Sequence, residues 1–273
     1  MHTNNFFQPT RMLLYFKKYA TDNLKFYILG ALATFGIMTG IGAFGVLVAH
    51  TTYTSTTNII PFYYIGLYLG SALLTSRSFN EFSSKEKSID FLMLPASQFE
   101  KFLTTFLITV VGYFIFYHIS CFLSLNIIEG LQNMKYNNQV KLVHDYEFLS
   151  NYREYWYYGY FLLQAIILLA ATWFHKYTLI KTIVSLFVVL LAVALVHSFI
   201  ILCLFGTEGE MYKRTAPFFL VGKQIYNLSN NSSYTEIYII PEWLRNTYLF
   251  IVKFIVGPAL LVLTYFRLKD KEI

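Results

Sequence analysis

The chain has 273 residues, and 13% of them are Lys, Arg, Asp or Glu. Soluble domains average about 25% charged residues, so this chain has about half the charge that a soluble surface of its size needs. Its high hydrophobic content excludes an intrinsically disordered protein, and its two cysteines are too few for a disulfide-stapled scaffold. A soluble enzyme is therefore disfavoured, and an integral membrane protein is indicated.

Residues 10–25 form an amphipathic segment ahead of the first apolar stretch. Apolar residues recur there at the three- and four-residue spacing of one helical face, at Leu13, Phe16, Ala20 and Leu24. Lys17 and Lys18 fall elsewhere on the helix. The pattern predicts a basic helix lying in the membrane interface; the alternative is an ordinary helical extension of the first span.

Six stretches are apolar enough to cross a bilayer, whose core of about 30 Å needs roughly 20 helical residues. They are residues 26–49, 59–75, 102–128, 157–174, 183–205 and 248–266. Their apolar runs are continuous, whereas barrel strands alternate. We therefore predict an all-α, polytopic transmembrane helix bundle with six spans, forming a single domain over residues 1–273.

The distribution of Lys and Arg orients this bundle. These residues are roughly twice as dense in the termini and the loops on the same side as in the opposite loops. Both termini are therefore predicted to be cytoplasmic. Residues 206–247 then form a large outer loop, in which 235–247 are expected to be a re-entrant or interfacial piece. The positive net charge needs no nucleic-acid partner, since no basic soluble module is present.

The cytoplasmic segment 76–101 carries eight of the charged residues. Ser97 and Glu100 have the spacing of a capping box directly before an apolar run. Pro95 disfavours a helical conformation at the residue before it. We expect a charged helix around 79–92, a break at 94–96, and a new helix that leads into the third span.

An apolar group, Phe91 to Leu94, follows those charges. Exposed on a cytoplasmic loop, it would suit docking to a protein partner. Alternatively, it packs under the bundle or into the membrane interface. Composition alone leaves both interpretations open.

No catalytic constellation is found in the sequence. It lacks the phosphate-binding Gly-x-x-x-x-Gly-Lys loop, the His-Glu-x-x-His zinc motif and the Gly-x-Ser-x-Gly elbow. We therefore expect no enzyme activity, metal or cofactor in this chain. His118 and His197 lie at membrane depth, where an ionisable residue is a functional candidate. They either bond across helices or line a substrate path.

Two glycine pairs have Gly-x-x-x-Gly spacing, which lets helix backbones approach closely. Gly36 and Gly40 lie in the first span, and Gly66 and Gly70 in the second. The two spans are predicted to pack on each other, or one pair to form a dimer seam.

The order of these parts resembles the membrane subunit of a bacterial type-2 ABC exporter, in its half-transporter form. The stretch Phe91-Leu-Met-Leu-Pro-Ala-Ser-Gln-Phe-Glu-Lys-Phe102 is similar to a segment of such permeases. The resemblance implies a multi-pass protein of the bacterial inner membrane. It also implies a homodimer or heterodimer of permeases, served by separate ATPase subunits that carry ATP and Mg. The substrate is not identified, and an amphipathic or lipid-like molecule would suit the apolar spans.

The resemblance further implies that residues 79–94 touch the ATPase and couple it to transport. The residues concerned are Glu81, Lys85, Glu86, Lys87, Asp90, Phe91, Leu92 and Met93. A different interpretation is a non-transporting membrane scaffold or sensor. It would bind a partner through the outer loops, 129–156 and 206–247, of which the first is longer and more polar than the resemblance leads us to expect.

Overall fold

The chain is predominantly helical, as predicted. The computed structural model describes residues 6–48, 60–136, 146–174, 176–205, 212–216, 220–227, 232–239 and 241–272. The helices and strands form two compact units, one of Met1–Leu179 with Gly257–Ile273 and one of Ile180–Val256. Each unit is described separately below.

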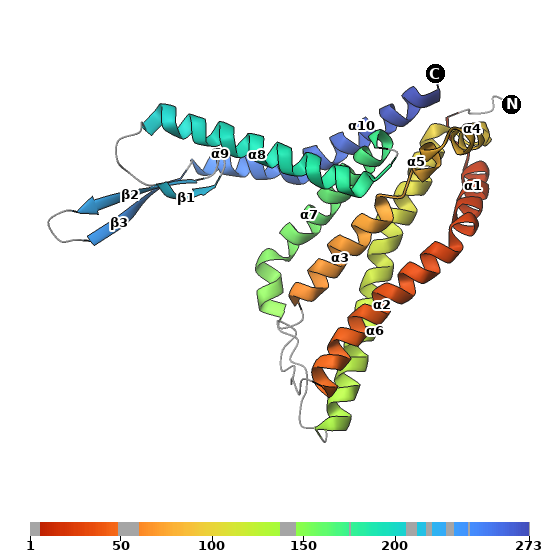
Figure 1. Ribbon diagram of the computed structural model, residues 1–273, viewed down its shortest axis with the longest axis horizontal. Helices are drawn as coiled ribbons and strands as arrows, with labels where there is room; N and C mark the ends of the chain where they lie inside the picture. Colours follow the sequence, from red (N-terminus) through yellow and green to blue (C-terminus); the bar gives the residue numbers. More distant parts are fainter. Residues whose placement is uncertain are drawn as a thin grey trace. The chain divides into compact units, whose positions relative to one another are not determined.

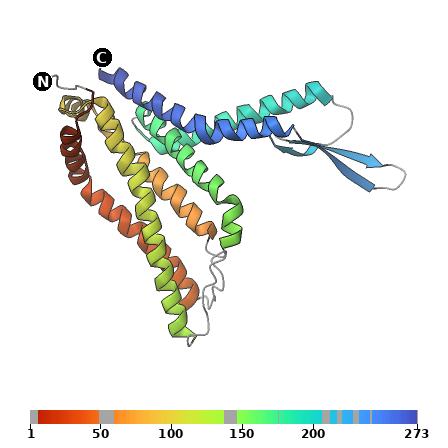
Figure 2. The same cartoon turned by 180° about the vertical axis from the view of Figure 1, so that it is seen from behind.

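The first unit is a set of long helices with short ones at one end (Figures 1 and 2). Its helices are α1 (Pro9–Asp22), α2 (Leu24–Leu47), α3 (Ile60–Thr75), η2 (Asn80–Ser83), α4 (Lys85–Met93), α5 (Gln98–Phe106), η3 (Leu107–Gly112), α6 (Tyr113–Lys135), α7 (Tyr146–Trp173), α10 (Gly257–Lys269) and η5 (Asp270–Glu272). Within it, α2 packs on α6, while α7 packs on both α3 and α10. η3 is a π-helical turn that joins α5 and α6 into one long helix.

The second unit contains α8 (Thr178–Phe205, from Ile180 on), a small sheet, α9 (Glu242–Phe250) and the π-helical turn η4 (Ile251–Val256). The sheet has the order β1 (Tyr212–Ala216), β2 (Leu220–Asn227), β3 (Ser232–Ile239), and both pairings are antiparallel. The sequence analysis did not predict this sheet inside the outer loop, although β3 is rich in the β-branched and aromatic residues that favour strands. Of the piece expected at 235–247, the first part is strand and the last part is α9.

Among the described residues, five helical runs are long and apolar enough to cross a membrane: Leu24–Leu47, Gln98–Lys135, Glu154–Trp173, Thr178–Cys203 and Glu242–Lys269. They match five of the six predicted spans. The remaining one, α3, is apolar but has 16 residues, so it reaches about 24 Å at 1.5 Å per residue.

Large apolar side chains remain exposed along these helices, including Leu29, Leu32 and Phe44 on α2, and Phe187, Leu190 and Phe199 on α8. Soluble proteins rarely expose apolar patches of such extent to water, whereas lipid tails accept them. The structure is therefore that of a multi-pass membrane protein.

The glycine pair of α3 receives two tyrosines from α6. A Cβ atom on Gly66 would lie 2.5 Å from the Tyr117 hydroxyl, and one on Gly70 would overlap the Tyr113 hydroxyl. Tyr113 donates a 3.3 Å hydrogen bond to the carbonyl of Gly66. Because Gly66 and Gly70 have no side chain, the tyrosines of α6 can approach the backbone of α3.

The glycine pair of α2 has different surroundings. Among the described residues, a Cβ atom on Gly36 or Gly40 would meet nothing within 4 Å. The close approach that Gly-x-x-x-Gly spacing permits is used by α3 against α6 in this chain, and not between α2 and α3 through their glycines.

Replacing Gly70 by Ala should destabilise the protein by about 1–3 kcal/mol, because the new methyl group overlaps the Tyr113 hydroxyl. Gly40→Ala is the matched control, since it adds the same group in open space and should stabilise α2 by about 0.5–1 kcal/mol. Thermal unfolding of the purified protein in detergent measures both. Equal unfolding temperatures for the two variants would contradict the packing described.

Candidate functional site

A single carboxylate, Glu100, joins α1 to the start of α5. Its side chain is 0% exposed and accepts four hydrogen bonds, two of them from Arg11. The Arg11 Nε and Nη2 atoms lie 2.7 and 2.8 Å from its two oxygens. The backbone N–H groups of Gln8 and Ser97 lie 2.7 and 2.9 Å away. We call this cluster the Glu100 junction.

The Glu100 junction includes the predicted capping box. Ser97 accepts from the backbone N–H of Glu100, and Glu100 returns the bond to the backbone of Ser97. The Ser97 hydroxyl also donates to the carbonyl of Phe6 over 2.6 Å. The two side chains of the capping box therefore have two roles: they cap the start of α5, and they hold the segment that precedes α1.

The charge of Glu100 is stabilised by these partners. Burial favours the neutral acid, but the hydrogen bonds from Arg11, Ser97 and Gln8 outweigh it and hold the pKa of Glu100 below its ordinary value. The guanidinium of Arg11 binds the carboxylate through two parallel hydrogen bonds, the strongest geometry for such a pair.

The segment between α3 and α5 contains the expected break before a second helix, but the single charged helix expected around 79–92 is two pieces, η2 and α4, divided at Ser84, whose backbone is extended. Ser84 caps α4 by accepting from the backbone N–H of Lys87. At the other end, Leu94 has an extended conformation, with ψ of 131° before Pro95. Between the two helices the chain turns, so that α4 and α5 are separate elements.

The expectation that Phe91 is exposed is wrong. Phe91 is buried against Phe82, with ring centroids 5.1 Å apart, and the Lys101 Nζ atom lies 4.9 Å from the centre of its ring. Of the other members of the apolar group, Met93 is 78% exposed, whereas Leu92 and Leu94 are half-buried. The alternative of packing under the bundle therefore holds fully for Phe91 and in part for Leu92 and Leu94, which pack against the same core, while Met93 stays exposed.

The C-terminal end of the chain meets the same aromatic cluster. The Lys271 Nζ atom lies 4.3 Å from the centre of the Phe82 ring. Burial, together with the charge of Arg267, lowers the pKa of Lys271 to about 8. Phe82 is thus held between Phe91 of α4 and the last turn of the chain.

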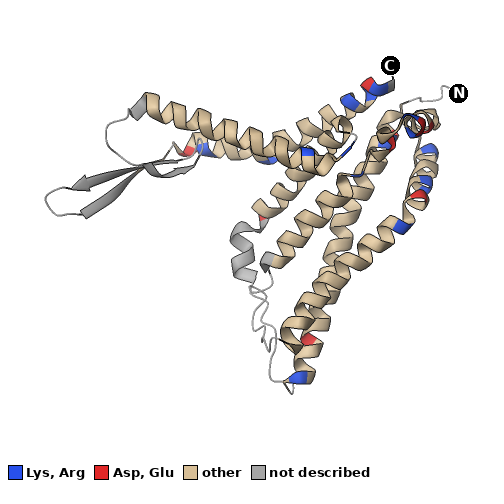
Figure 3. Cartoon of the chain, in the orientation of Figure 1, with Lys and Arg blue, Asp and Glu red and all other residues tan. Residues whose placement is uncertain are grey.

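The other residues predicted to couple the chain to a partner divide into two faces of α4 and η2. Lys85, Glu86 and Met93 are exposed and line neither of the two cavities described here. Lys87, Asp90 and Glu81 instead line a cleft of about 600 Å³, whose opposite wall is α1. Figure 3 shows how charged residues gather around α1, α4 and the start of α5, while the bodies of the long helices nearly lack them.

Glu81 is the least solvated acid of this cleft. Its Oε2 atom is buried and has no hydrogen-bond partner among the residues that the structure describes. Burial raises the pKa of Glu81, and the nearby Asp22 acts in the same direction, while Lys87 and Lys18 oppose it. The hydroxyl of Tyr15, across the cleft on α1, is likewise buried without a partner.

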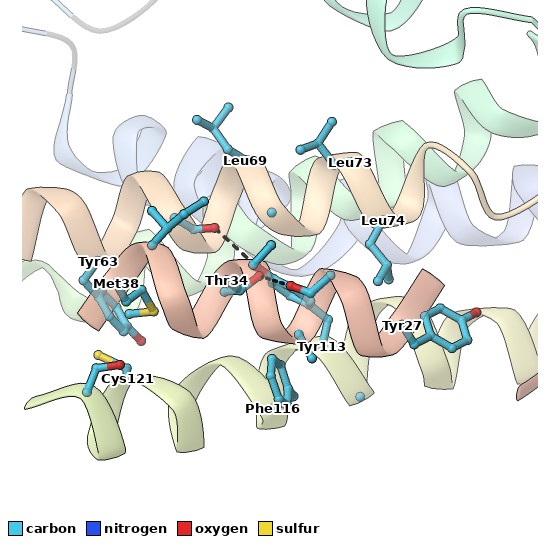
Figure 4. A pocket seen from close by; sticks show the side chains of 18 of the residues that line it. Tyr27, Thr34, Met38, Tyr63, Leu69, Leu73, Leu74, Tyr113, Phe116 and Cys121 are labelled. Atoms are coloured by element: carbon cyan, nitrogen blue, oxygen red, sulfur yellow. Dashed lines mark hydrogen bonds between the residues drawn. The ribbon is translucent and has the colours of Figure 1, made fainter. Parts of the chain in front are cut away.

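A separate apolar groove of about 900 Å³ lies among α2, α3 and the η3–α6 helix. Residues of all three line it, among them Thr34 and Met38 on α2, Leu69 and Leu73 on α3, and Phe116 on α6 (Figure 4). The groove has room for a long apolar chain, and ligand sites of proteins have volumes of about 300–1,000 Å³. The sequence analysis did not predict it.

The π-helical turn η3 forms part of the groove wall. Leu107, Ile108 and Gly112 all line the groove. The carbonyl of Val110, in the same turn, accepts a 2.9 Å hydrogen bond from the Tyr160 hydroxyl of α7. π-Turns inside helices are frequent at functional sites, and here a buried tyrosine adds a second hydrogen bond to a carbonyl of the irregular turn.

His118 bonds across helices and is not among the residues that line the groove. Its Nδ1 atom lies 2.8 Å from the carbonyl of Phe114, which can only accept, so Nδ1 carries the hydrogen. Nε2 of the neutral ring then accepts from Tyr63 of α3 over 2.7 Å, and the Tyr157 hydroxyl of α7 is 3.2 Å away. His118 therefore links α6 to α3 and α7. His197 is buried in α8, in the second unit.

A polar group that the sequence analysis did not single out joins α3 and α7. Gln164 donates to Ser71 over 2.6 Å and accepts from Thr75 over 2.5 Å, and all three side chains are fully buried. Interhelical bonds of this kind each stabilise a membrane bundle by about 0.6–2 kcal/mol. An amide in the otherwise apolar fourth span is the signal that could have pointed to it.

Among the described residues, no group of three or more His, Cys, Asp or Glu side chains is placed to hold a metal ion. Comparison of the chain with protein families, with curated proteins and with solved structures gave no match.

Replacing Glu100 by Gln should loosen α1 and destabilise the protein by about 1–3 kcal/mol, because the change removes the charge that holds Arg11. In the unchanged protein, the depressed pKa of Glu100 contributes stability above the ordinary carboxyl pKa of 4.5, and this is lost as the pH falls through the lower folded-state pKa. Trypsin cleavage at Lys17 and Lys18 measures the release of α1.

Glu86→Gln provides the control, since it makes the same chemical change on an exposed side chain of α4. It should leave cleavage unchanged. If Glu100→Gln and Glu86→Gln were cleaved at the same rate as the unchanged protein, the Glu100 junction would not hold α1.

Proposed function

We propose that this chain is the membrane subunit of an ATP-driven exporter of the bacterial inner membrane, with both termini in the cytoplasm. Two copies, or this chain and a related one, would form the transport path. Separate ATPase subunits would carry ATP and Mg, because this sequence contains no nucleotide-binding motif. The multi-pass helical structure is compatible with this role, and the resemblance in the order of parts supports it.

The observation that carries the proposal is the arrangement of α4. The helix presents Lys85, Glu86 and Met93 outward, the mixture of charge and exposed apolar surface that suits a protein partner. Its opposite face is fixed by Phe91 against Phe82. Because α4 is anchored on one side, a partner that pressed on its exposed side would move the helix without detaching it from the bundle.

Two contacts would transmit this movement of α4 to the membrane helices. Lys101, in the helix that continues into the third span, is fully buried and bonds to the carbonyl of Leu92 at the end of α4. One residue away, the Glu100 junction holds α1, which leads directly into α2. Movement of α4 would thus tilt α2 and the η3–α6 helix, two of the three helices that line the groove.

The groove favours a substrate with an apolar part. Its lining is almost wholly apolar, with tyrosine hydroxyls, Thr34 and Ser124 as its few polar groups. An amphipathic or lipid-like molecule is therefore the class of cargo that we propose.

The ATPase contact is tested with variants of the exposed face. Lys85→Glu and Met93→Ser should each reduce the ATPase recovered with the tagged chain from its native membranes by about tenfold, since each removes a central contact. Lys17→Glu, an exposed charge reversal on α1, is the control and should have no effect. Mass spectrometry of the co-purified proteins identifies the ATPase by its nucleotide-binding motif.

Full recovery of an ATPase with both α4 variants would exclude α4 as the coupling contact. Absence of any ATPase from the unchanged chain would favour a scaffold or sensor that acts through its outer segments.

A further inference from the structure

The cleft between α1, η2 and α4 has the properties of a ligand site. It measures about 600 Å³, which falls within the usual range for small-molecule sites. Two polar atoms on its walls, Glu81 Oε2 and the hydroxyl of Tyr15, are buried and have no partner within the described part of the chain. Tyr15 is only 5% exposed. Buried polar groups cost free energy unless they form hydrogen bonds, so a ligand that donates hydrogen bonds would satisfy both.

The charges around the cleft favour a ligand that carries one positive and one negative charge. Lys18 and Asp22 pair with each other at 2.8 Å. The remaining charged residues that line it are the cations Arg77 and Lys87 and the anions Glu81 and Asp90. An anionic ligand would face two carboxylates, and a cationic ligand would face two bases. A molecule with one ammonium and one phosphate matches both signs.

The ammonium must also carry hydrogens. A primary ammonium offers three donors, whereas a quaternary ammonium offers none and would leave Glu81 Oε2, which only accepts when ionised, without a hydrogen bond. The ring of Tyr19 also lines the cleft, and aromatic rings attract a cation. The other two rings of the lining, Phe26 and Phe91, already lie against Arg77 and Lys101. Phosphoethanolamine is the simplest group with this chemistry.

The place of the cleft points to a lipid as the source of this group. Its wall α1 is amphipathic, exposes Leu13 and Leu14, and leads into the membrane-length helix α2. Phe26 lines both the cleft and the apolar groove. A headgroup in the cleft would therefore have its acyl chains beside an apolar surface.

We propose that the cleft binds the headgroup of a phosphatidylethanolamine-type lipid. The ammonium bonds to Glu81 and Tyr15, and the phosphate is held by Arg77 and Lys87. This inference goes beyond the proposed function, because a lipid site at this place does not require an ATPase partner.

Native mass spectrometry of the full chain in detergent tests the proposal. Phosphatidylethanolamine should bind about tenfold more tightly than phosphatidylcholine or phosphatidylglycerol with the same acyl chains. Affinity should fall stepwise as methyl groups replace the ammonium hydrogens. Soluble phosphoethanolamine separates the two sources: competition by millimolar amounts or less would overturn the lipid as the source, and a lack of competition supports it.

Variants assign the binding to the cleft. Glu81→Gln should reduce phosphatidylethanolamine binding about tenfold, and Tyr15→Phe, which removes only the hydroxyl, by about fivefold. Glu86→Gln makes the same change as Glu81→Gln outside the cleft and should bind as the unchanged protein does. Thermal unfolding of each variant checks that it is folded.

Equal binding of the three lipids would overturn the proposal, and so would a Glu81→Gln variant that binds as tightly as the Glu86→Gln control. In either case the cleft holds only water. The exposed-face variants Lys85→Glu and Met93→Ser should keep full lipid binding, so failure of the ATPase contact and failure of the lipid site give different results.

Discussion

The Glu100 junction is the constraint on which the end of the first unit that contains α1, α4 and the start of α5 depends. One buried carboxylate starts α5, closes the capping box with Ser97, and holds Arg11 and the N–H of Gln8. A carboxylate without partners would be costly to bury, so the segments that supply its donors must stay assembled. The position of α1 follows from that requirement, and with it one wall of the cleft and the path of the chain into α2.

Within the long helices, hydrogen bonds from hydroxyl and amide groups join neighbouring helices. At the end of the bundle, the charged Glu100 junction has this role. Lipid tails are as apolar as leucine side chains, so burial alone does not hold membrane helices together. The tyrosines of α6 reach the backbone of α3 through Gly66 and Gly70. Gln164 links α7 to α3, and Tyr160 donates a hydrogen bond to the irregular turn η3. The apolar groove lies among α2, α3 and the η3–α6 helix, where α3 and α6 are joined by these tyrosines.

Local rules predicted the elements but not all of their surroundings. The capping box and the break before Pro95 follow from side chains within a few residues of each other, and the structure contains them. The charged helix expected around 79–92 is present only from Lys85 on, because Ser84 starts a new helix there. Phe91 differs, because its burial depends on Phe82 and Lys101, which lie nine and ten residues away. Likewise, the sheet at 212–239 depends on pairing between strands, which strand propensity alone does not reveal in an outer segment.

The sequence by itself determined that this is a multi-pass helical membrane protein, because a bilayer of fixed thickness imposes a length and a composition that can be read directly. It also determined where the charges lie, since these are excluded from the spans. Only the tertiary structure decided which glycines pack, whether Phe91 is exposed, and that Glu81 and Tyr15 face one cleft. These properties belong to pairs of residues far apart in the chain, and their contacts are set by how the helices pack.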